Sequence, residues 1–120
     1  MTIDIRQLLR VARRLKEATG YFELGMMQHA LDSLENLGEL GPFEAEVSLL
    51  RGVILRRQNR FDDARAELRT AAEKFPAPFD RSAWYALSLC YRQVGDMNRA
   101  IQSLARARGA SPHKERPSAL

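Results

Sequence analysis

Residues 83–112 decide the fold, and they read AWYALSLCYRQVGDMNRAIQSLARARGASP. The spacing of the apolar residues predicts two short helices joined by a turn at Gly95-Asp96. Bulky side chains share one face of the first predicted helix: Trp84, Leu87 and Tyr91. The small Ala100 on the second helix allows the two helices to approach closely. Pro112 ends the unit because proline cannot continue a helix.

The same unit occurs twice more upstream. Ala64 precedes Ala100 by 36 residues, and Ala30 precedes Ala64 by 34 residues. A proline follows each second predicted helix: Pro42, Pro76 and Pro112. A period of this length is typical of stacked repeats, and 34 residues is the period of one helix-turn-helix class. The sequence therefore predicts one motif used three times.

This pattern resembles the tetratricopeptide repeat family, most closely in the third unit. The first two units depart from it, because Arg14 and Ser48 occupy the position of Trp84. The resemblance implies an all-α fold of three stacked helix-turn-helix repeats that form a short right-handed α-solenoid over residues 1–112. The repeats are expected at about 11–42, 45–76 and 81–112, and residues 113–120 as a flexible polar tail.

Helix boundaries follow from capping residues and breakers. A first helix capped by Thr2 or Asp4 is expected to end near Leu24, and Asp80 is expected to cap the fifth. The remaining expected helices cover about residues 26–37, 43–58, 61–74, 81–94 and 97–108. Gly52 is expected to face a close helix contact, and Gly20 to mark close packing or a bend.

Composition bounds the class of protein. The chain has 120 residues, enough for one small domain with a modest core. Cys90 is the sole cysteine, which excludes an intramolecular disulfide and favours a reducing compartment, with the cytoplasm as the default. Residues 1–17 contain no uninterrupted apolar run, so neither a secretory signal nor a membrane span is expected there.

The charge is unevenly distributed. The net charge is +4, yet residues 21–50 hold six acidic side chains and no Lys or Arg. A stripe of arginines on the first helix, Arg6, Arg10, Arg13 and Arg14, is what nucleic-acid binding would need. No groove-reading motif or interleaved aromatic residue accompanies it, so nucleic-acid binding is not favoured.

Motifs that carry chemistry are absent from the sequence. Neither His29 nor His113 stands at a metal-site spacing with Cys90, and there is no nucleophile elbow or phosphate loop. We expect no enzyme activity, no cofactor and no metal. A reactive thiol is one interpretation of Cys90, but a small buried side chain inside a repeat is favoured.

In proteins that this chain resembles, the first helix of each repeat lines a concave groove. Carried over position by position, the groove residues are Leu15, Thr19, Phe22 and Glu23 in the first unit, Leu49, Val53, Arg56 and Arg57 in the second, and Tyr85, Leu89, Arg92 and Gln93 in the third. They form an apolar floor with an arginine rim. Such a floor indicates a partner, unless curvature of the solenoid buries it against itself.

The function that follows is a non-catalytic protein-protein interaction module. It would bind a peptide or protein segment with apolar anchors in the concave groove. One alternative is a small bacterial chaperone resembling those of type III secretion translocators. Another is a self-associating assembly scaffold, because Ile101 and Leu104 lie at the uncovered C-terminal edge and predict a homodimer.

Overall fold

The computed structural model describes residues 4–109, and this part of the chain is all-α. Six α-helices follow one another: α1 (Ile5–Glu23), α2 (Met27–Ser33), α3 (Glu44–Arg57), α4 (Phe61–Lys74), α5 (Arg81–Gln93) and α6 (Met97–Ala107). One short 3-10 turn, Gly41–Phe43, precedes α3. The expected tail at 113–120 lies outside the described residues.

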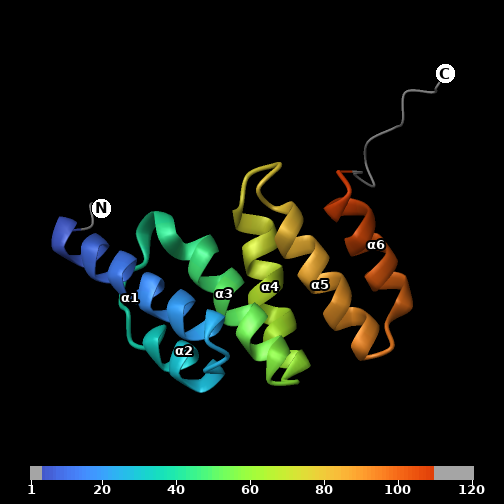
Figure 1. Ribbon diagram of the computed structural model, residues 1–120. Coiled ribbons are helices and arrows are strands. Elements are labelled where there is room, and N and C mark those ends of the chain that lie inside the picture. The colour runs from blue at the N-terminus through green and yellow to red at the C-terminus, as the bar shows by residue number, and fades with distance from the viewer. Residues whose placement is uncertain (1–3, 110–120) are drawn as a thin grey trace.

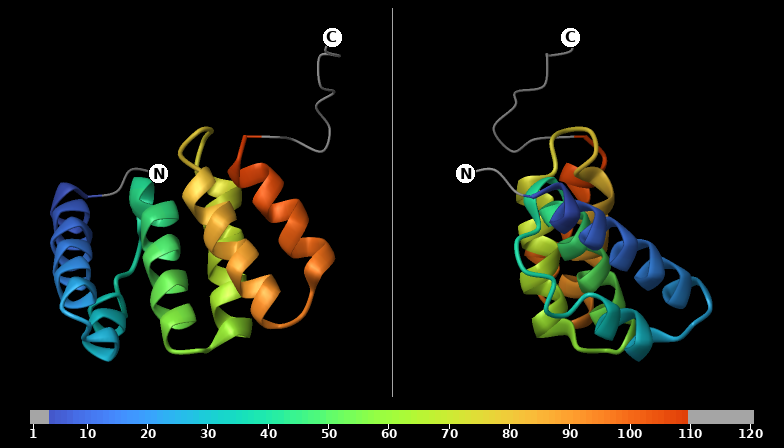
Figure 2. Two further views of the ribbon diagram at one scale, coloured as in Figure 1. Left: turned by 45° about the vertical axis from the view of Figure 1, so that its right-hand side comes forward. Right: turned by 90° about the vertical axis from the view of Figure 1, so that its left-hand side faces the viewer.

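The helices form a row of antiparallel neighbours (Figures 1 and 2). Helix α1 lies at one end of the row and α6 at the other. The molecule measures 52 × 34 × 22 Å, and its radius of gyration is 15.7 Å. A compact domain of this size would have a radius of about 13 Å. The row of helices is therefore a short helical solenoid, as the repeat pattern predicted.

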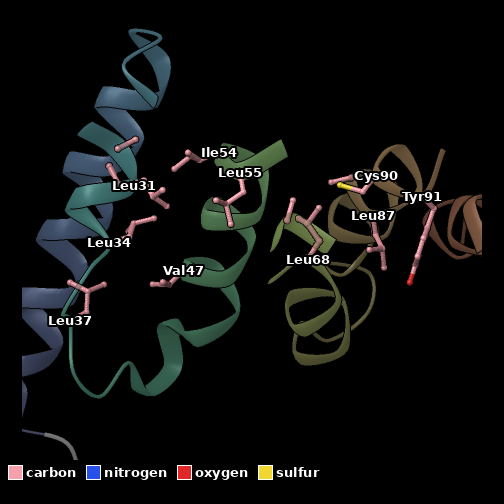
Figure 3. Close-up of a cluster of buried hydrophobic side chains, with 14 of the residues drawn as sticks. Leu31, Leu34, Leu37, Val47, Ile54, Leu55, Leu68, Leu87, Cys90 and Tyr91 are labelled. Carbon is pink, nitrogen blue, oxygen red and sulfur yellow. The ribbon is translucent and has the colours of Figure 1, made fainter. Parts of the chain in front are cut away.

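The core is a continuous strip that passes from one pair of helices to the next (Figure 3). Its labelled members are Leu31, Leu34, Leu37, Val47, Ile54, Leu55, Leu68, Leu87, Cys90 and Tyr91. The three repeat alanines, Ala30, Ala64 and Ala100, are all buried. A Cβ added at Gly52 would lie 2.6 Å from the Leu68 side chain, which confirms the close contact expected at this glycine.

Helix α2 is shorter than predicted. It ends at Ser33 rather than near Leu37, because Asn36 and Gly38 adopt positive φ angles of 54° and 76° that a helix cannot contain. Leu37 is nevertheless buried, so its place in the repeat core is kept without helical backbone.

Side chains of α1 hold the carbonyl groups that this early end leaves free. Arg14 Nε donates to Ser33 O at 2.9 Å, and Arg10 Nη1 donates to Leu37 O at 2.9 Å. Gln7 Nε2 donates to Leu37 O and Glu39 O. We call Gln7, Arg10 and Arg14 the α1 polar row. Two arginines of the stripe considered for nucleic-acid binding thus serve the fold.

Two smaller expectations were met only in part. Asp80 stands at the N-cap position of α5, but its carboxylate makes no capping bond and instead accepts a hydrogen bond from Trp84 Nε1 at 3.1 Å. Gly20 does not mark close packing, since a Cβ there would meet nothing within 4 Å, and α1 continues through it to Glu23. Asp4 does cap α1, with its carboxylate 3.2 Å from Arg6 N.

Candidate partner groove

Five of the predicted groove residues line one cavity of about 300 Å³ between α1 and α3. They are Leu15, Thr19 and Phe22 from α1, with Leu49 and Val53 from α3. Residues four apart on a helix share a face, so Leu15, Thr19 and Phe22 turn toward α3 together. We call this cavity the inner cavity.

The third-unit residues do not line the inner cavity. Tyr85, Leu89 and Arg92 belong to α5, which packs beside α3. Tyr85 is 52% exposed, Leu89 is half-buried and Arg92 is exposed. The structure therefore brings together five of the eight groove residues predicted for the first two units, and the third-unit residues lie outside this cavity.

The floor of the inner cavity is only partly covered. Leu15, Phe22, Leu49 and Val53 are half-buried, each packed on one side against the core. Thr19 is exposed. Curvature of the solenoid therefore covers this floor in part, and apolar surface remains open to solvent.

The arginine rim has two different members. The Arg57 guanidinium lies 5.0 Å from the centre of the Phe22 ring, a cation-π contact across α3 and α1. Arg56 is half-buried, and its Nε forms no hydrogen bond within the described residues. Arg57 is thus held at the cavity by an aromatic face rather than by a carboxylate.

Two residues of the inner cavity were not predicted from the sequence. Glu46 and Leu50 also line the inner cavity. The groove positions of the family recur in every unit, whereas Glu46 and Leu50 line the cavity because α3 faces α1. Glu46 is exposed and adds a carboxylate to a border that the sequence predicted as basic.

Cys90 is part of α5, and its side chain lies in the core rather than in the inner cavity. It is fully buried, as favoured from the sequence. Burial raises the pKa of the Cys90 thiol, and the positive charges of Arg56 and Arg65 oppose this shift only in part. A raised pKa disfavours the thiolate, which is the reactive form.

The proposed oligomer edge is partly open. Ile101 is 63% exposed, Met97 one turn earlier is 51% exposed, and Leu104 is half-buried. Within residues 4–109 no three His, Cys, Asp or Glu side chains group as metal ligands would. No helix in that range is both long and apolar enough to cross a membrane.

The sequence matches known proteins along most of its length. The family model described as tetratricopeptide repeat matches residues 15–77 and 49–115. The chain is also similar to the Phagocyte signaling-impaired protein of Drosophila pseudoobscura pseudoobscura, with 29% identity over 103 residues. That match covers 86% of this chain but 10% of the relative, so the chain spans about a tenth of its length.

Proposed function

The chain belongs to the tetratricopeptide repeat family, whose repeats are protein-protein interaction modules, and we propose that its groove binds a segment of another polypeptide. The observation that carries the proposal is the half-buried apolar floor of the inner cavity. Exposed apolar surface that gathers in one hollow is typical of an interaction site. The proposed role is binding without catalysis.

The chemistry of the cavity suggests the kind of segment. Leu15, Phe22, Leu49 and Val53 offer an apolar seat for one aliphatic or aromatic anchor. Exposed Tyr85 and half-buried Leu89 on α5 would contact residues further along the segment. Arg57 beside the cavity and exposed Arg92 on α5 would favour acidic residues in the bound segment and speed association.

The test blocks the inner cavity without disturbing the core. Thr19 is exposed at the cavity, and its hydroxyl donates only to Leu15 O within the same helix. Thr19→Arg should therefore fill the cavity and leave the fold intact. Leu49 is less suitable, because it packs against two clusters of buried side chains and a lysine there would unfold the repeat.

Thr70→Arg is the matched control. The Thr70 hydroxyl also donates to a carbonyl one turn earlier in its own helix, Ala66 O of α4. Thr70 lies outside the inner cavity. Peptides selected from a displayed random library on the unaltered chain should carry an apolar anchor. Calorimetry should show that these peptides bind Thr70→Arg with unchanged affinity. Their affinity for Thr19→Arg should fall by about tenfold or more, since anchor contacts carry most of the binding energy. Equal affinity for both variants would contradict the proposal that the segment binds in the inner cavity.

A further inference from the structure

A second cavity lies on the other side of α5 and shares no residue with the groove. It has a volume of about 380 Å³ and is formed by α4, α5 and α6. Three arginines, two aromatic residues and one acid dominate its lining: Arg69, Arg99, Arg106, Trp84, Tyr91 and Glu73. We call it the outer cavity.

Arg106 is held at this cavity by an aromatic side chain. Its guanidinium carbon lies 4.6 Å from the centre of the Trp84 ring. Trp84 is itself fixed, because its Nε1 donates to the Asp80 carboxylate at 3.1 Å. Within residues 4–109 Arg106 forms no ion pair. A guanidinium beside an aromatic ring keeps a fork of N–H donors for an anion.

The other two arginines keep donors as well. Arg99 contacts Asp96 through Nη1 at 3.2 Å, and Arg69 contacts Glu73 through Nε at 3.3 Å. Each of these contacts uses one nitrogen of a side chain that carries five N–H donors. Three guanidinium groups against one carboxylate leave the lining positively charged.

Helices α5 and α6 are basic, whereas α4 carries charges of both signs. Residues 81–109 hold five arginines and one acidic residue, Asp96, and α4 holds three basic and four acidic side chains. A partner that carries negative charge would be steered toward this end of the molecule. The acidic stretch of residues 21–50 spans the end of α1, all of α2 and the start of α3, which precede α4 in the row of helices (Figure 1).

We propose that the outer cavity binds the oxyanion groups, carboxylate or phosphate, of an acidic polypeptide segment. A single-stranded nucleic acid fits less well, because its bases would need open aromatic faces on which to stack. Tyr91 is 5% exposed, and the Arg106 guanidinium lies over the Trp84 ring. The site thus offers charged donors without a stacking platform.

Trp84 makes the proposal directly testable, because it is the sole tryptophan of the chain. Its indole N–H gives a single NMR signal at the cavity wall. Titration of the full chain with hexaglutamate, and separately with a phosphoserine peptide of equal length, should shift this signal. The stronger of the two titrations identifies the oxyanion. Added salt should weaken binding, since the contacts are ionic.

Variants then assign the binding to the outer cavity. Arg99→Gln should weaken it by about tenfold, the loss expected for one charge-assisted hydrogen bond. Arg106→Gln should do the same, with folding checked by circular dichroism. Arg99 is well exposed, so its variant keeps the test valid if Arg106→Gln is poorly folded.

Arg108→Gln is the matched control. Arg108 is the exposed C-cap residue of α6 and does not line the cavity. Thr19→Arg, which blocks the inner cavity, should leave hexaglutamate binding unchanged. The proposal is overturned if the indole signal does not move, or if Arg108→Gln weakens binding as much as Arg99→Gln. Tighter binding of oligothymidine at the same signal would also overturn it.

Discussion

Two glycines inside helices, Gly20 and Gly52, lie in opposite surroundings. A Cβ at Gly52 would lie 2.6 Å from Leu68 Cδ2 and 3.2 Å from Leu68 N, and Leu68 is fully buried. Gly52→Ala should therefore lower the free energy of unfolding by about 1–3 kcal/mol, the usual cost of overpacking. A Cβ at Gly20 would have free space, so Gly20→Ala should raise the free energy of unfolding by up to about 1 kcal/mol.

Urea denaturation of the two variants measures both changes. Because the substitution is the same and both sites are helical, any difference between them comes from packing alone. A stabilised Gly52→Ala would mean that α3 and α4 do not cross at this glycine.

Single residues differ in how far the sequence predicts them. Gly52 and Cys90 were predicted correctly, because the repeat pattern places both on the inward face of a helix. The hydrogen-bond partner of Asp80 was not predicted, because a carboxylate before a helix can accept from backbone N–H groups or from a side chain one turn later. Here the carboxylate accepts from the Trp84 indole, a partner that rules for helix capping do not include.

At the scale of elements, α2 shows how one helix depends on another. It has seven residues, and isolated helices of that length are not stable in water. Arg14 supports its end through two contacts, from Nε to Ser33 O at 2.9 Å and from Nη2 to Asp32 O at 3.2 Å. Arg14→Ala should lower the free energy of unfolding by about 1–2 kcal/mol, because two charged donors are lost and one of them serves a part-buried carbonyl.

The measurement is urea denaturation, together with amide hydrogen exchange in α2, which should quicken first. Arg13→Ala is the control, since Arg13 is the exposed neighbour of Arg14 on the same helix. If both variants lose equal stability, the α1 polar row does not support α2.

The early end of α2 shows where repeat reasoning fails. The spacing of Ala30, Leu34 and Leu37 predicted a helix through Leu37, and all three side chains are indeed buried. Periodicity reports which side chains face inward, however, and a turn can place Leu37 inward as well as a helix can. Gly38 can end a helix, but Asn36 already adopts a positive φ of 54°, and its carbonyl accepts a hydrogen bond from Arg10 of α1.

At the scale of the whole molecule, elongation and the order of the helices follow from the repeat period. The groove was predicted only in part. The first two units meet at the inner cavity because α1 and α3 are neighbours, whereas Tyr85 and Leu89 lie beyond it on α5. The outer cavity was not predicted, because its arginines come from two helices that are not adjacent in the sequence, α4 and α6.

A solenoid also has ends, and each end repeat exposes a face that a neighbour would cover. Met97 and Ile101 are 51% and 63% exposed on α6, one turn apart. Burial of apolar surface contributes about 25 cal/mol per Å², so pairing of this edge with a second copy would be favourable. We predict a homodimer formed through α6. Light scattering over a range of concentrations should show twice the mass of the chain.

Ile101→Asp should convert this dimer to a monomer, whereas Asn98→Asp should not, because Asn98 is an exposed polar residue on the same helix that gains the same charge. Ile5→Asp tests the other end, where Ile5 and Leu9 are 67% and 62% exposed on α1. If Ile5→Asp also breaks the assembly, the copies stack head to tail, and such contacts extend into open chains rather than closing as pairs. A chain that stays monomeric well above micromolar concentration, unaffected by Ile101→Asp, would refute pairing through α6.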